Sequence, residues 1–202
     1  GRNLLLLVDP AQPQARVVAT SVLPPDLGVQ LLAGTIVGPH SGTLAKLPPT
    51  ITLLSRYPRH EITQALDRLT LFPSAGALRL EKNTSDWKIQ PILASGSTGW
   101  LERGELQAQV TFNDGTDLTG PLLLGVALER KHADTGNVAR IVIISDADFL
   151  ANQYLANQAN SELGLRIVDW LTRPDTSVEL PVRQSPDQIL TLHGRALQGV
   201  AF

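Results

Sequence analysis

A strand that leads into an acidic turn and then into helices is the feature that most constrains the fold. Ala139–Ile144 has the length and apolar character of a buried strand, and Ser145-Asp146-Ala147-Asp148 follows it directly. Leu4–Val8 is an unbroken apolar run of the same kind. Unbroken rather than alternating apolar residues predict strands covered on both faces, as in a parallel sheet flanked by helices.

Helical structure is predicted after the acidic turn. The chain is expected to turn helical from Phe149, and a second helix is expected to start at Ser161, whose hydroxyl can cap it. Arg173-Pro174 ends this helix because proline cannot continue the hydrogen-bond ladder. One stripe of the helix carries apolar residues: Leu163, Ile167, Val168 and Leu171.

The middle of the chain is predicted to be rich in short strands separated by turn residues. These strand-like runs are residues 69–72, 77–82, 88–95, 106–112 and 121–129. Together the elements predict an α/β fold with a mixed, largely parallel sheet and a β-rich middle segment. Residues 1–175 are expected to form a single, partial α/β domain, and residues 176–202 an extended C-terminal tail.

Composition limits the classes of partner. With 202 residues, 43% of them hydrophobic, the chain can bury a core of about one domain and is not intrinsically disordered. Its net charge of -2 gives no electrostatic footprint for nucleic acid. No apolar run approaches the roughly 18 residues of a membrane helix. The absence of methionine predicts an excised or processed fragment that lacks upstream elements.

The acidic turn is one candidate ligand site. Asp146 and Asp148 follow the carboxyl end of a predicted parallel strand, where α/β sheets place ligands, and Asn152 comes one helical turn later. Carboxylate and amide oxygens can bind a hard cation. The alternative is structural: Asp148 caps the following helix while Asp146 accepts hydrogen bonds from loop amides. The set lacks the spacing of a calcium loop, so no metal is predicted.

No pattern in the chain predicts a catalytic centre or a cofactor. Cysteine is absent, which excludes a thiol nucleophile, and no nucleophile elbow, dinucleotide fingerprint or phosphate-binding loop is present. The histidines are scattered: His40, His60, His132 and His193. Trp100 follows a flexible Ser- and Gly-rich stretch, so an exposed aromatic contact with a ligand is a further candidate. Trp170 is expected in the core.

Several segments, taken in order, resemble the GldG-like auxiliary components of ABC-type transport and gliding-motility systems. The closest correspondence is Arg140–Leu171, which is similar to that family's strand, Asp-x-Asp-Phe turn, asparagine-bearing helix and closing Trp-Leu helix. The other segments are Leu4–Pro10, Leu27–Val37, Tyr57–Thr63, Leu69–Pro73 and Gly120–Ala127. The resemblance covers nearly the whole chain.

The resemblance implies a fold similar to the class I glutamine amidotransferase-like or flavodoxin-like group. It also implies a periplasmic or extracytoplasmic domain, anchored to the inner membrane by transmembrane helices outside this sequence and placed beside an ABC permease and ATPase. The family carries no agreed catalytic set, so a non-enzymatic binding role is expected. An exposed sheet edge would allow pairing with a second copy. A hydrolase built on Asp146, Asp148 and a distant histidine, and a glycan-binding module using Trp100, remain alternatives.

Overall fold

Strands dominate the structure. The computed structural model describes residues 3–10, 23–38, 46–81, 86–106 and 110–174. Of these residues, 34% lie in strands and 16% in helices. The predicted tail 176–202, His40, His193 and part of the predicted strand 106–112 lie outside the described residues, and the described part of 106–112 contains no strand.

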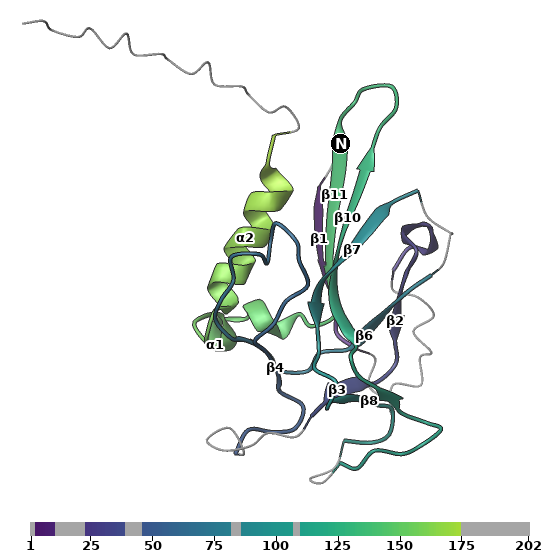
Figure 1. The fold of residues 1–202 in the computed structure, drawn as a ribbon, viewed down its shortest axis with the longest axis vertical. Helices are drawn as coiled ribbons and strands as arrows, with labels where there is room; N and C mark the ends of the chain where they lie inside the picture. Colours follow the sequence, from purple (N-terminus) through teal and green to yellow (C-terminus); the bar gives the residue numbers. More distant parts are fainter. Residues whose placement is uncertain (1–2, 11–22, 39–45, 82–85, 107–109, 175–202) are drawn as a thin grey trace, which may run out of the picture.

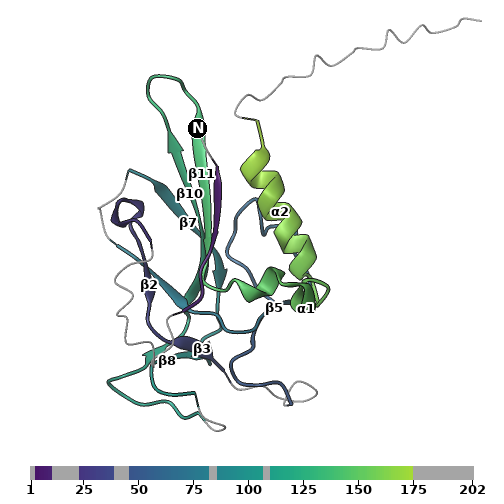
Figure 2. The same ribbon diagram turned by 180° about the vertical axis from the view of Figure 1, so that it is seen from behind.

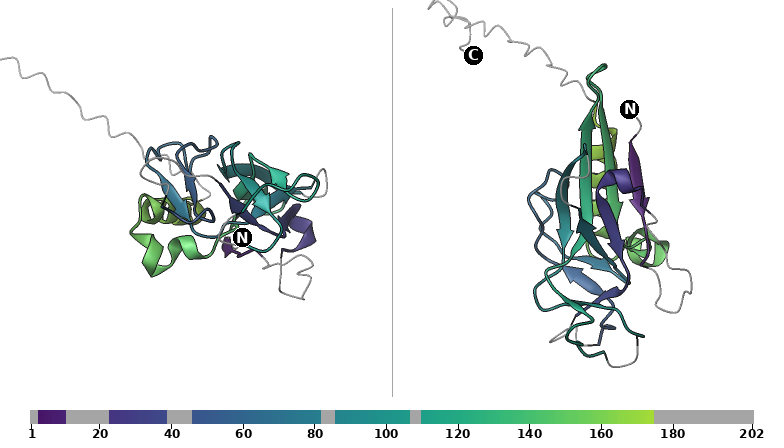
Figure 3. Two further views of the ribbon diagram at one scale, coloured as in Figure 1. Left: turned by 90° about the horizontal axis from the view of Figure 1, so that it is seen from below. Right: turned by 90° about the vertical axis from the view of Figure 1, so that its right-hand side faces the viewer.

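The main sheet has six strands and is curled (Figures 1 and 3). Its order is β1-β11-β10-β6-β2, and β7 also pairs with β10. A register irregularity between β10 and β7 near Gly125 accompanies this curl, because bulges bend the strands that carry them. The strands are β1 (Leu4–Leu7), β2 (Val29–Leu32), β6 (Ala77–Leu80), β7 (Lys88–Ala94), β10 (Leu123–Lys131) and β11 (Val138–Ile144).

Two smaller sheets and four short or medium helices complete the described structure. A three-stranded sheet contains β3 (Thr35–Val37), β8 (Trp100–Glu102) and β9 (Leu118–Thr119), and a two-stranded sheet contains β4 (Thr52–Leu54) and β5 (Thr70–Phe72). The helices are η1 (Pro25–Leu27), η3 (Asp148–Leu150), α1 (Asn152–Leu155) and α2 (Asn160–Thr172). Both α-helices lie on the same side of the main sheet (Figures 1 and 2).

The predicted flavodoxin-like α/β fold is therefore wrong. The pairing of β1 with β11 is the only parallel one between described strands, and the other pairs are antiparallel. The two faces of β11 are nevertheless both buried: Val142 and Ile144 face the α2 side, and Ile141 and Ile143 face the other side. An unbroken apolar run indicates that a strand is buried on both faces, but it specifies neither the direction of the strand nor the elements that cover each face.

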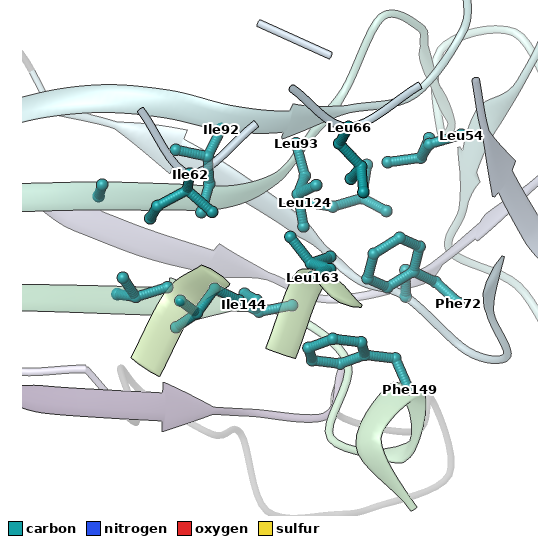
Figure 4. Packing of buried hydrophobic residues seen from close by; sticks show 14 of the residues in the cluster. Leu54, Ile62, Leu66, Phe72, Ile92, Leu93, Leu124, Ile144, Phe149 and Leu163 are labelled. Atoms are coloured by element: carbon teal, nitrogen blue, oxygen red, sulfur yellow. The ribbon is translucent and has the colours of Figure 1, made fainter. Parts of the chain in front are cut away.

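The larger core lies between the main sheet, α2 and the segment that joins β4 to β5 (Figure 4). The rings of Phe72 and Phe149 pack there at a tilt of 34° with centroids 5.2 Å apart, and Leu163 packs from α2 beside them. Trp170 is buried, as predicted. Val168 is 50% exposed, so its predicted place in the buried stripe is wrong. It follows Ile167 by one residue, a rotation of about 100° that turns it away from the sheet.

One strand of the main sheet, β1, forms an edge and leaves one side of its backbone without a strand partner among the described residues. Leu4, at its start, is 46% exposed. Pairing with a second copy through this edge stays a prediction. Within the described part of the chain, no helix has the length and apolar character needed to span a membrane.

Gly34 is a point where the backbone requires glycine, and Gly34→Ala is expected to destabilise the protein by about 2 kcal/mol. Its φ of +119° is rarely adopted by other residues, and a Cβ would lie 2.5 Å from the carbonyl oxygen of Glu102 on the neighbouring strand. Urea unfolding would measure the loss. Gly96→Ala is the control, because a Cβ there meets no atom within 4 Å; equal losses in both variants would contradict the explanation.

Candidate functional site

A cavity of about 850 Å³ lies between the loop that follows β4, the strands β7 and β10, and the C-terminal half of α2. Figures 1 and 2 show this loop beside α2. Polar and charged side chains supply most of the lining. The lining residues include Arg56, Tyr57, Arg59, His60, Glu61, Gln64, Lys88, Gln90, Glu129 and Trp170.

The loop is anchored by hydrogen bonds and by one apolar side chain. The Tyr57 hydroxyl lies 2.8 Å from the carbonyl oxygen of Leu54, 2.7 Å from that of Arg68 and 3.1 Å from Oγ1 of Thr70. Burial raises the pKa of Tyr57, so this hydroxyl keeps its proton. Ile62 is only 1% exposed and packs into the core. These contacts give the cavity a fixed wall.

His60 is the buried polar side chain of this wall. It is 8% exposed, and its ring meets that of Trp170 edge to face at 5.2 Å between centroids. Its Nδ1 accepts a hydrogen bond of 3.2 Å from the backbone N–H of Ile62. Burial lowers the pKa of His60, so the ring is neutral at pH 7. With Nδ1 accepting, Nε2 must carry the proton and is a donor.

The two carboxylates of the cavity already have cationic partners. Glu129 on β10 stands between Lys88 and Arg140 in the strand ladder, and its Oε1 lies 3.3 Å from Nε of Arg140. Arg140 also donates to the carbonyl oxygen of Arg173 and lies over the ring of Trp170. Glu61 pairs with Arg173.

Three cationic side chains of the lining remain. Arg56 and Arg59 lie on the loop and Lys88 lies on the sheet, so they occupy opposite walls of the cavity. All three are exposed, and none of them forms an ion pair with a described residue. The cavity therefore has an excess of unneutralised positive charge.

The acidic turn that the sequence singled out lies elsewhere. Asp146 is fully buried, and its two carboxylate oxygens accept hydrogen bonds of 3.0 Å from the backbone N–H groups of Ser74 and Phe149. Burial raises the pKa of Asp146 to about 6. Asp148 and Asn152 follow it but are exposed. Asp146 thus accepts the loop amides, as the structural alternative expected, but the expected helix cap by Asp148 is wrong, because no side-chain capping bond forms at η3 or α1. A ligand role for Asp146, Asp148 and Asn152 stays a prediction.

The hydrolase alternative needs a histidine near Asp146. His132 directly follows β10 and hydrogen-bonds to Asn137 just before β11, so the length of β11 separates it from Asp146 by roughly 30 Å. His60 contacts Trp170, whereas the Asp146 turn adjoins the start of α2 through Asn160, about 15 Å away along the helix. Among the described residues, no cluster of three or more potential metal ligands exists.

Trp100 lies on β8 of the small sheet and does not line the cavity. Its Nε1 donates to Oε2 of Glu102 over 3.1 Å, and its ring meets that of Phe112 edge to face, with centroids 6.3 Å apart. Trp100 is half-buried by these contacts, while Phe112 is 41% exposed. The structure therefore does not bring Trp100 together with the acidic turn, and its predicted ligand contact is untested.

Sequence reasoning did not identify the cavity as a site. The segment Tyr57-Pro58-Arg59-His60 carried part of the family resemblance, and its density of ring and basic side chains was the one local signal. Lys88, Gln90 and Glu129 join this segment only through the pairing of β7 with β10. No spacing along the chain could have revealed that juxtaposition.

Comparison with known proteins gives a fold relative only. No protein-family model matches the chain, and no curated protein matches it. Among solved structures, the "mmIFT52 N-terminal domain" is similar, with a TM-score of 0.59 at 15% sequence identity. The match covers 86% of this chain and 66% of that one, so the chain spans just under two thirds of the length of that domain. At this identity the likeness concerns the fold alone.

Proposed function

We propose that this chain is a non-enzymatic binding domain of the auxiliary protein of a membrane-anchored ABC-type transport system. In this proposal the domain lies on the periplasmic or extracytoplasmic face of the inner membrane. It binds a substrate or a partner subunit, and the permease and the ATPase of the system are its partners. Membrane helices outside this sequence would hold it in place.

The observation that carries this proposal is the ordered resemblance of six segments to the GldG-like components, from Leu4 to Leu171. The closing part of that resemblance, Arg140–Leu171, falls on one continuous unit made of β11, η3, α1 and α2. Tyr57–Thr63, another of the six, forms most of the loop wall of the cavity. A shared segment that builds a cavity wall supports a binding role for that cavity.

The arrangement of the candidate catalytic groups supports a role other than catalysis. Both oxygens of Asp146 accept backbone hydrogen bonds, which leaves this buried carboxylate engaged in holding its own turn. The described histidines, His60 and His132, lie far from it, so no described histidine can act with Asp146 as a base. The cavity instead offers charge and hydrogen-bond donors, which are features of a binding site.

The test is affinity purification of the full-length protein from its own membrane in mild detergent, followed by mass spectrometry. We expect an ABC permease and an ATPase to be recovered with it. Repetition with chemical crosslinking would retain weakly bound subunits. Recovery of the protein without transporter subunits in both experiments would contradict the proposed function.

A further inference from the structure

The cavity beside α2 carries an excess of positive charge. Its two carboxylates, Glu61 and Glu129, are neutralised by Arg173 and Arg140, which approach them from α2's end and from β11. Arg56, Arg59 and Lys88 have no such partner among the described residues and line opposite walls. Low-dielectric walls that carry one excess sign of charge concentrate oppositely charged solutes.

The loop wall of the cavity adds a directed hydrogen-bond donor, His60. His60 is 92% buried, and its Nδ1 is occupied by the amide of Ile62, which leaves the Nε2–H group without a hydrogen-bond partner among the described residues. Its ring is held against Trp170 on α2. His60 lines the cavity, and its Nε2 is not among the buried polar atoms that lack a partner, so this N–H group is open to the cavity and can donate to a ligand there.

We propose that this cavity binds a small organic anion, with its carboxylate or phosphate group held by Arg56, Arg59 and Lys88 and with His60 Nε2–H as a further donor. The inference rests on the proposed binding function and names the chemical class of the ligand. A volume of about 850 Å³ falls within the range of small-molecule sites. Arginine forks match pairs of oxygens on carboxylates and phosphates, and the partly exposed ring of Tyr57 offers apolar surface for the carbon skeleton.

Calorimetric titration of the protein at low ionic strength tests the proposal, with citrate and glycerol 3-phosphate as probes. We expect saturable binding of at least one probe, and weakening by salt. Arg59→Gln and Lys88→Gln are each expected to weaken binding about tenfold, as loss of a charged hydrogen bond implies. Arg79→Gln is the matched control: Arg79 is an exposed cation of β6 outside the cavity, and its loss should leave binding unchanged.

His60→Ala should weaken binding without unfolding the protein, whereas His60→Gln, which keeps a donor, should restore part of the affinity. No saturable binding of either probe at millimolar concentrations would overturn the proposal. An equal loss of probe affinity in Arg79→Gln and Lys88→Gln would also overturn it, because the probe would then be attracted by exposed positive charge anywhere on the protein and not by the cavity. So would binding of a hexaglutamate peptide with neither small probe, which would identify an acidic protein segment as the ligand.

The purification and the calorimetric titration distinguish failure of the proposed function from failure of the anion site. Recovery of the transporter subunits, together with no probe binding, would leave the proposed function standing and remove the anion site. Probe binding that depends on Lys88 and Arg59, without transporter subunits, would support the anion site and remove the assignment to an ABC system.

Discussion

Replacing Asn160 by alanine is expected to lower the free energy of unfolding by about 3–5 kcal/mol, the largest effect of any single substitution considered. Its side chain is fully buried at the start of α2 and joins three elements. Oδ1 accepts from the N–H of Leu71 over 2.9 Å, and Nδ2 donates to the carbonyl oxygens of Leu71 and Phe149 over 2.8 and 2.9 Å. Alanine would leave these three backbone groups buried without partners.

Urea unfolding followed by circular dichroism would measure this loss. Asn157→Ala is the matched control, because the Asn157 side chain is exposed and donates only to the carbonyl oxygen of Gln153 in its own turn; a change within about 0.5 kcal/mol is expected there. Asn160→Asp separates the contribution of the accepted hydrogen bond from that of the two donated ones, since it keeps an acceptor for the N–H of Leu71 and loses both donations. A loss below about 1 kcal/mol in Asn160→Ala would show that water replaces the amide, contrary to this account.

Asn160 also illustrates what local sequence rules cannot decide. Those rules place a helix start at Ser161 because a hydroxyl can cap a helix, and the helix does begin one residue earlier, at Asn160. No side-chain capping bond forms there. The amide of Asn160 instead crosses to β5, whose Leu71 is 89 residues away in the chain. A contact of that separation leaves no periodic trace in the sequence.

Short strands and their ends were predictable because they depend on neighbouring residues. Leu4–Leu7, Thr70–Phe72 and Val138–Ile144 are strands where apolar runs predict them. Gly28 ends η1 in the αL conformation, with φ of 67°, which glycine adopts readily. Each of these outcomes is decided within a few residues by side-chain shape and backbone freedom.

Sheet topology was not predictable because it depends on residues that are far apart in the chain. Strand direction depends on how the connections run in three dimensions, and β10 pairs antiparallel with both β11 and β7 although their apolar runs resemble those of a parallel sheet. The cavity depends on the same pairing, since Lys88 and Glu129 become neighbours only through it. The fold class and the candidate site were thus missed together, from a single physical cause.

The stability of the protein is expected to depend on pH through Asp146. Burial raises the pKa of this carboxyl from 3.8 to about 6 in the folded state, despite the opposing hydrogen bonds from Ser74 and Phe149. The folded protein therefore binds the proton more tightly than the unfolded chain does. Its contribution to stability is fully present below about pH 4 and is lost as the pH rises through 6, a change of about 3 kcal/mol.

Asp146→Asn removes this titration, because the carboxamide stays neutral at every pH. The difference in unfolding free energy between the native protein and this variant should fall by about 2.5 kcal/mol between pH 4 and pH 7. Asparagine has one acceptor oxygen fewer than aspartate, which changes the unfolding free energy by the same amount at every pH. The effect of the titration is therefore read from the pH dependence of the difference. Asp148→Asn, in the same turn but exposed, controls for the change in net charge.

A slope shared by Asp146→Asn and Asp148→Asn would indicate general charge repulsion and contradict the role of burial. A difference independent of pH would mean that the two backbone amides compensate fully for the lost water. In that case, the turn after β11 would hold an ionised aspartate without energetic cost. The pH series thus separates the two forces that act on this carboxylate, desolvation and hydrogen bonding, at the position where the sequence suggested a ligand site.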